Sequence, residues 1–86
     1  MIIKTQTSKN IKYNGVNFPT VTTYFTTKGK FGLRAFVRTD EEGNSEVKVI
    51  KGDGRTSNFH VFSARQLKSE EVSEKLIENL LAAANP

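Results

Sequence analysis

The feature that most constrains the fold is a change in the spacing of apolar residues about two thirds of the way along the chain. Up to residue 63, turn-forming residues separate short segments rich in Val, Thr, Phe and Tyr, which suit a pleated sheet. From Ser69 onward, apolar residues recur at the three- and four-residue spacing of a helix. This order predicts an α+β fold in which a sheet is followed by a helix.

Four turn signals divide the first part of the chain. The strongest is Asn14-Gly15, the dipeptide preferred in two-residue hairpins. We predict an antiparallel β-meander of four to five strands within residues 1–63, with Pro19 at a bulge or an edge position. The other three turn signals are Lys28–Lys30, Asp40–Asn44 and Lys51–Arg55.

One C-terminal helix is predicted over about residues 69–84, packed on one face of the sheet. Ser69 suits its N-cap, and the acids that follow suit the positive end of the helix dipole. An earlier start at Ser63 is an alternative, because Ser63 and Gln66 have the spacing of a capping box. The predicted apolar stripe comprises Val72, Leu76 and Leu80, widened by Ile77, Leu81 and Ala84.

Length and composition bound both fold and function. Eighty-six residues, 36% of them hydrophobic, make one domain (residues 1–86) whose small core a partner or self-association would complete. Without cysteine, disulfides, thiolate zinc sites and cysteine nucleophiles are excluded. The sequence has no apolar run near the ~20 residues of a membrane span and no signal-peptide pattern at its start. We expect a cytoplasmic protein, or one of the host cytoplasm if viral.

The sequence carries no pattern that predicts catalysis, a metal site or a cofactor. His60 is the single histidine, and the acids are not spaced as a chelate. The segment Gly52–Arg55 lacks the spacing and the Lys-Ser/Thr of a phosphate-binding loop, so we interpret it as a hairpin turn. We therefore expect a protein that is not an enzyme and uses no cofactor.

Charge is distributed unevenly along the chain. The formal net charge is +4, but residues 1–39 contain seven Lys and Arg and no acid, which gives +7. Residues 40–86 contain six Lys and Arg against nine acids, which gives −3. Such asymmetry favours a polyanionic partner. The alternative is that a sheet and a helix differ in composition without a functional reason.

Alternation along each strand assigns the side chains to two faces. The face expected to contact the helix carries Val21, Phe25, Phe31, Leu33, Ala35, Val37, Val47, Val49, Phe59 and Val61. The second face mixes aromatic rings with cations and has little acid: Tyr24, Arg34, Phe36, Arg38, Lys48, Ile50, His60 and Phe62. A slip of one residue in register would reverse these assignments.

The second face predicts binding of single-stranded DNA or RNA, because rings stack on bases while Arg and Lys neutralise phosphates. Cations in the turns would extend the basic track at the ends of the sheet. The predicted nucleic-acid-binding residues are Tyr24, Lys28, Lys30, Arg34, Phe36, Arg38, Lys48, Lys51, Arg55 and Phe62.

Two alternatives remain open for the same surface. Phe36, Ile50 and Phe62 also suit a homodimer interface that joins two sheet faces, or packing under the N-terminal strand. The basic face also suits an acidic protein surface, and the acidic side of the helix suits a basic one. Either would fit a small phage- or plasmid-type interaction protein that inhibits or modulates a host protein. No membrane partner is expected.

Several segments in sequence order suggest a family. Lys28–Phe31 opens an alternating strand, an acidic turn and then a basic turn follow, and Ser63–Leu67 leads into a helix. Over about residues 22–82 this order resembles the positive-cofactor-four and Whirly-type single-stranded-DNA-binding coactivators. The resemblance implies four antiparallel strands, dimerisation through the helix and strand binding on a curved sheet. The basic positions that match are Lys28, Lys30, Arg34, Arg38 and Arg55. The hairpin at Asn14-Gly15 is additional, and Leu67 stands where a large aromatic residue is usual.

Overall fold

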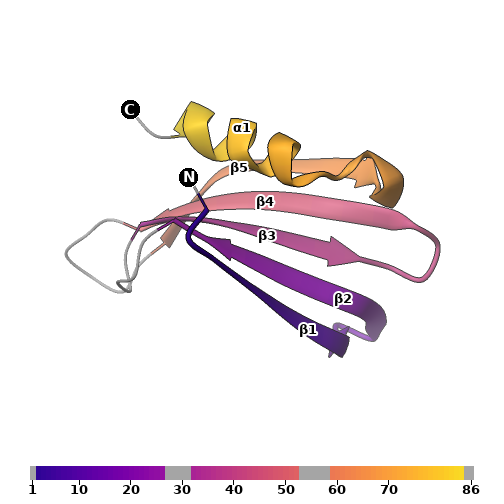
Figure 1. Ribbon diagram of the computed structural model, residues 1–86. Coiled ribbons are helices and arrows are strands. Elements are labelled where there is room, and N and C mark those ends of the chain that lie inside the picture. Colours follow the sequence, from indigo (N-terminus) through magenta and orange to yellow (C-terminus); the bar gives the residue numbers. More distant parts are fainter. Residues whose placement is uncertain (1, 27–31, 53–58, 85–86) are drawn as a thin grey trace.

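The computed structural model describes residues 2–26, 32–52 and 59–84. Five strands form one antiparallel sheet in chain order, and the C-terminal helix α1 packs against β3 and β4 (Figure 1). The predicted meander followed by one helix is therefore confirmed. The elements are β1 (Lys4–Tyr13), β2 (Val16–Phe25), β3 (Leu33–Thr39), β4 (Asn44–Gly52), β5 (Phe59–Lys68), the 3₁₀ turn η1 (Ser69–Glu71) and α1 (Glu74–Ala84).

The hairpin of β1 and β2 turns at Asn14-Gly15, as predicted. These two residues have φ angles of 51° and 78°, which a two-residue type I′ turn requires. Farther from the turn, the pairing of the two strands skips Asn10 and Pro19. Proline has no N–H to donate, and Asn10 has a φ of 55°, so regular pairing is interrupted there.

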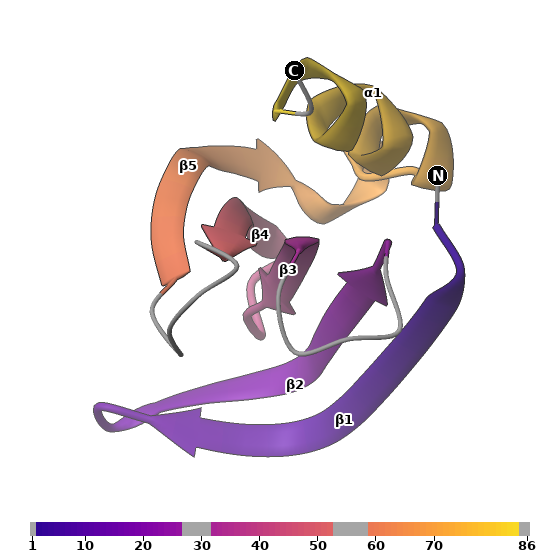
Figure 2. The ribbon, with the colours of Figure 1, turned by 90° about the vertical axis from the view of Figure 1, so that its left-hand side faces the viewer.

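The tip of this hairpin extends beyond the rest of the sheet. Strand β2 pairs with β3 only from Thr20 to Phe25, so the residues nearer the turn have no neighbour on that side. The tip bends toward the sheet face opposite α1 (Figure 2). Two contacts hold it there, because Asn17 Nδ2 donates to Glu41 Oε1 at 3.1 Å and Arg38 lies over the ring of Phe18.

Strand β5 is longer than predicted and includes one of the two predicted helix starts. Leu67 lies opposite Ser45 and packs against the core, so the chain stays extended as far as Lys68. The strands therefore do not end by residue 63, and the capping box proposed for Ser63 and Gln66 is wrong. Packing of Leu67 against the core thus stabilises an extended chain more than the capping box stabilises a helix here.

The α-helix begins five residues later than predicted from Ser69. Ser69 instead opens the single 3₁₀ turn η1, where its hydroxyl lies 2.9 Å from that of buried Ser45. Ser73 acts as the cap of α1, since its Oγ accepts the N–H of Leu76 at 3.1 Å. The acids at the start of the predicted helix are thus divided between η1 and the first turn of α1.

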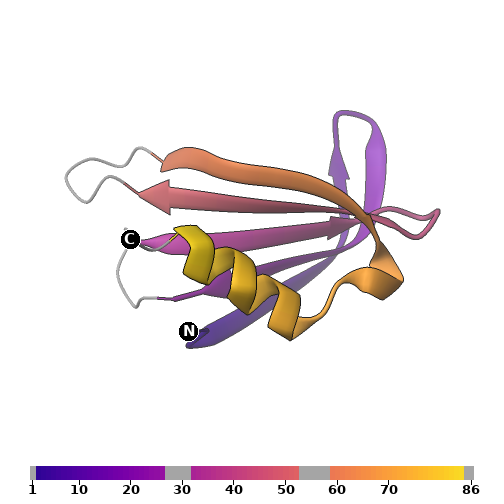
Figure 3. The same ribbon diagram turned by 90° about the horizontal axis from the view of Figure 1, so that it is seen from above.

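The core lies between α1, which crosses the sheet obliquely (Figure 3), and the strands beneath it. Its helical part centres on Ile77 and Leu81, and Val72 and Leu80 pack at its margin. Leu76, expected at the centre of the stripe, is only half-buried. The buried apolar residues are Leu33, Ala35, Val37, Val47, Val49, Ile77, Leu81 and Ala84. No helix among the described residues is long and apolar enough to cross a membrane.

Candidate nucleic-acid interface

The face of the sheet opposite α1, which we call the open face, carries a group of cations beside aromatic rings. Residues paired directly across two antiparallel strands share a face. Phe36 is paired with Lys48, Arg38 with Glu46, and Arg34 with Ile50. Alternation along β3 and β4 therefore placed these side chains on one face correctly, and four of the predicted binding residues lie together: Arg34, Phe36, Arg38 and Lys48.

Strand β2 presents the opposite side chains from those expected. Tyr24 is paired with Ala35 and packs against the core, so it lies on the helix face and not on the open face. Burial, and then the negative charge of Glu74, raise the pKa of Tyr24. Phe25 and Val21 lie on the open face instead, opposite Arg34 and Arg38. Alternation within β2 was right, but its phase relative to β3 depends on the connection between the strands.

A bulge at the start of β5 reverses the faces predicted for His60 and Val61, so that prediction is wrong. Val49 is paired with Ser63 but Ile50 with Val61, so Phe62 is an extra residue between two pairs. Val61 consequently lies on the open face, and His60, paired with Lys51, lies on the helix side. The exposed fractions of Val61 and Phe62 are 58% and 52%. The bulge shifts the alternation by one residue, which a count along the sequence does not reveal.

The predicted cations at the ends of the sheet do not join the open face in the described residues. Lys51 belongs to β4 and is paired with Leu33, whose side chain is buried under α1, so this lysine lies on the helix side. Lys28, Lys30, Phe31 and Arg55 lie outside the described residues, as does the side chain of Phe59.

Cations lie over the rings at both ends of the open face. The guanidinium of Arg34 is 4.9 Å from the ring centre of Phe25, and the Lys4 ammonium is 5.6 Å from it. The guanidinium of Arg38 is 5.0 Å from the ring centre of Phe18 and 5.4 Å from that of Tyr13. Such contacts fix the cations in position beside aromatic surface.

Tyr13 and Phe18 are site residues that the sequence reasoning missed. Their strands alternate regularly only up to Asn10 and Pro19, where the pairing is interrupted. Beyond that point both rings reach Arg38 on the open face. Pro19 was the sequence feature that could have indicated this. An interruption of pairing at Pro19 permits the side chains beyond it to point to the other face.

Two adjoining pockets share Arg38 and Glu46 on the open face, and we call them together the open-face trough; the larger of them also extends past the end of the sheet to Ser45, Leu67 and Glu71 on the helix side. The central pocket, about 230 Å³, has an apolar lining from Val21, Phe36 and Ile50 beside Lys48. The end pocket, about 570 Å³, lies toward the turn between β3 and β4. Arg38 and Glu46 line both pockets and form an ion pair between them.

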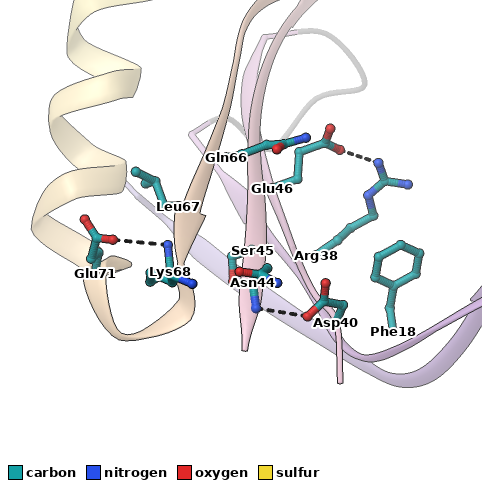
Figure 4. Close-up of a pocket in the computed structure, with 10 residues that line it drawn as sticks. All are labelled: Phe18, Arg38, Asp40, Asn44, Ser45, Glu46, Gln66, Leu67, Lys68 and Glu71. Atoms are coloured by element: carbon teal, nitrogen blue, oxygen red, sulfur yellow. Dashed lines mark hydrogen bonds and ion pairs between the residues drawn. The ribbon is translucent and has the colours of Figure 1, made fainter. Parts of the chain in front are cut away.

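The end pocket combines a ring with hydrogen-bonding groups from three strands (Figure 4). Phe18 and Arg38 lie on one side of it, Glu46 and Gln66 lie next to each other above, and Leu67, Lys68 and Glu71 lie on the other side. The Oδ1 atom of Asp40 accepts the backbone N–H groups of Glu42 and Asn44, each at 2.9 Å. These bonds, that of Asn44 foremost, hold the pKa of Asp40 below its ordinary value of 3.8.

Both edges of the sheet carry cations without acids among the described residues. The edge strand β1 contains three lysines, and β5 contains Arg65 and Lys68. The described acids other than Glu46 lie in the turn between β3 and β4, in η1 and in α1. Edge lysines discourage pairing with another sheet edge. Of these cations, Lys4 shares the open face with Phe25 and Lys68 lines the end pocket, whereas Arg65, paired with buried Val47, lies on the helix side.

The described residues contain no group of three His, Cys, Asp or Glu side chains arranged to hold a metal ion. Comparison with models of protein families, with curated proteins and with solved structures found no match. The resemblance to single-stranded-DNA-binding coactivators therefore remains an expectation drawn from the sequence.

Proposed function

We propose that this protein binds single-stranded DNA or RNA in the open-face trough and does not catalyse a reaction. The observation that carries the proposal is the interleaving of cations and rings on the open face, where Glu46 is the acid that lines the central pocket. Aromatic side chains and cations combined in this way are how sheet surfaces hold single strands.

The trough favours single strands over duplexes. Phe36 and the apolar lining of the central pocket offer contact to the flat side of a base, which a duplex keeps stacked inside. Lys48, paired with Phe36, is placed to neutralise the phosphate next to such a base. Beside Arg38, which lines both pockets, Tyr13 is 56% exposed and offers a second ring.

Fluorescence anisotropy with a labelled nine-residue dT oligonucleotide tests the proposal. Phe36→Leu retains an apolar side chain but removes the ring, and one stacked base contributes about 1–3 kcal/mol. We therefore expect Phe36→Leu to weaken binding by roughly fivefold to 100-fold. The same sequence as a duplex should bind more weakly than the single strand. Absence of binding to the single strand at low salt would refute the proposal.

A second candidate function is contact with an acidic protein surface. Exposed aliphatic side chains favour a protein partner over a nucleic acid, because they lack rings for stacking on bases. Ile11, Val16 and Val61 are 39%, 47% and 58% exposed. A homodimer joined through the open faces would use the same side chains. A pull-down from lysate with and without nuclease, combined with a solution mass measurement, separates these possibilities. A protein partner that survives nuclease supports the second candidate.

A further inference from the structure

We infer that the end pocket of the trough receives one unstacked guanine base of the bound strand. This inference rests on the proposed function and specifies its substrate class. Sites for small ligands usually have volumes of about 300–1,000 Å³, and the end pocket has about 570 Å³. It adjoins the central pocket through Arg38 and Glu46, so a strand lying along the trough reaches both.

Arg38 is positioned to recognise one edge of guanine. The Glu46 carboxylate and the rings of Phe18 and Tyr13 hold its guanidinium. The ion pair uses Nη2 of Arg38, and a guanidinium has five N–H donors, so donors remain for a ligand. Guanine presents two adjacent acceptors, N7 and O6, and a bidentate bond from arginine to these atoms is the commonest specific contact with a base.

Glu46 complements the next edge of the same base. Its Oε1 atom binds Arg38, and a carboxylate has further acceptor positions. Guanine is the base that adds two adjacent donors, N1–H and the N2 amino group, to its two adjacent acceptors. Donors from Arg38 beside acceptors from Glu46 therefore match guanine better than adenine, cytosine or thymine.

The rest of the pocket suits a base better than a phosphate. Asp40, Glu46 and Glu71 line it together with Arg38 and Lys68, and these carboxylates repel an anion. The ring of Phe18 provides stacking surface, while the Arg38 guanidinium faces the edge of the base. The phosphates are thus expected along the more basic part of the trough, near Lys48, with the base in the end pocket.

Single-base substitutions in the oligonucleotide test the inference on the unaltered protein. Nine-residue dT strands with one central dG, dA, inosine or 7-deazaguanine are compared with dT alone by anisotropy. A bidentate pair is worth about 1–3 kcal/mol, so dG should bind roughly fivefold to 100-fold more tightly than dA or dT. Inosine lacks the amino group for Glu46, and 7-deazaguanine lacks N7 for Arg38, so each should lose most of this preference.

Glu46→Gln provides the protein side of the test, with Glu78→Gln on the exposed surface of α1 as the control of equal charge change. Glu46→Gln should strengthen binding of plain dT, because Arg38 loses its carboxylate partner, but should abolish the preference for dG. Glu78→Gln should retain that preference. Equal affinity of the unaltered protein for dG, dA and dT strands would overturn the inference. If dT itself still bound, the proposed function would stand.

Discussion

Tyr24 and Phe25 are adjacent in β2 but point to opposite faces, and their surroundings differ accordingly. Tyr24 packs against the core near α1, whereas Phe25 lies under Arg34 and Lys4. Because Tyr24 lies on the helix face, Val21 and Phe25 of the same strand lie on the open face, where Val21 lines the trough. This makes a single phenol group a probe of the register.

The pKa of Tyr24 should be measurable in a Tyr13→Phe variant, which leaves one tyrosine. Burial and the charge of Glu74 both disfavour the phenolate, so the titration midpoint should lie above the ordinary 10.0. Ultraviolet absorbance of the phenolate against pH gives the midpoint. A midpoint at or below 10.0 would mean that Tyr24 faces solvent and that the register of β2 is the one expected from the sequence.

Because of Asp40, the stability of the folded protein should depend on pH in the acidic range. Its pKa is lowered in the folded chain because the carboxylate accepts backbone N–H groups of the turn. Its contribution is therefore present above the ordinary pKa of 3.8 and is lost as the pH falls through the lower folded value.

The variant Asp40→Ala should accordingly have a lower Tm than the unaltered protein at neutral pH, and the difference should shrink below about pH 4. Thermal unfolding followed by circular dichroism between pH 7 and pH 2 measures it. Glu42→Ala, in the same turn, controls for the loss of a charge. A Tm difference that stayed constant or grew on acidification would contradict the role of Asp40.

At the scale of elements, helix α1 stabilises the fold through one narrow stripe. Ile77 is 0% exposed, whereas its neighbour Leu76 is half-buried. Ile77→Ala should lower the free energy of unfolding by about 2–5 kcal/mol, and Leu76→Ala by clearly less. Urea unfolding of the two variants compares them directly. Equal losses of stability would mean that Leu76 is as deeply buried as Ile77, as the sequence predicts.

The elements differ in how far the sequence predicts them. The turn at Asn14-Gly15, the meander and the faces of β3 and β4 follow from local patterns, because turn chemistry and alternation act between neighbours. The phase of β2 and the bulge beside Phe62 depend on how strands join and pair, which no local pattern records. As a result, Arg34, Phe36, Arg38 and Lys48 were grouped correctly, while Tyr24 was misplaced and Phe18 was missed.

At the scale of the whole molecule, the unequal charge of the two halves of the sequence becomes a spatial separation. Arg34, Arg38 and Lys48 lie on the open face, while most described acids lie in α1, in η1 and in the turn between β3 and β4, where Asp40 and Glu71 line only the end pocket. The phosphates of a polyanion are therefore attracted to the central pocket near Lys48 and repelled from the helix. This separation predicts which cations contribute to the salt dependence of binding.

Lys48 and Lys75 provide a matched pair for this prediction, since one lies in the trough and the other on the exposed side of α1. Each phosphate neutralised on a single strand contributes about −0.7 to the slope of log K against log salt concentration. Lys48→Ala should make the slope shallower by about that amount, and Lys75→Ala should leave it unchanged. Anisotropy titrations at several salt concentrations give the slopes. Equal slopes for both variants would exclude a phosphate contact at Lys48.

Binding of a single strand in the trough can be mapped residue by residue in solution. The ¹⁵N-labelled protein is titrated with an unlabelled nine-residue dT oligonucleotide while the backbone amide resonances are followed. We predict that shifts cluster in β2, β3 and β4 around Val21, Phe36 and Lys48, and that residues of α1 from Glu74 to Ala84 stay in place. Shifts confined to α1, or no shifts at low salt, would contradict the account.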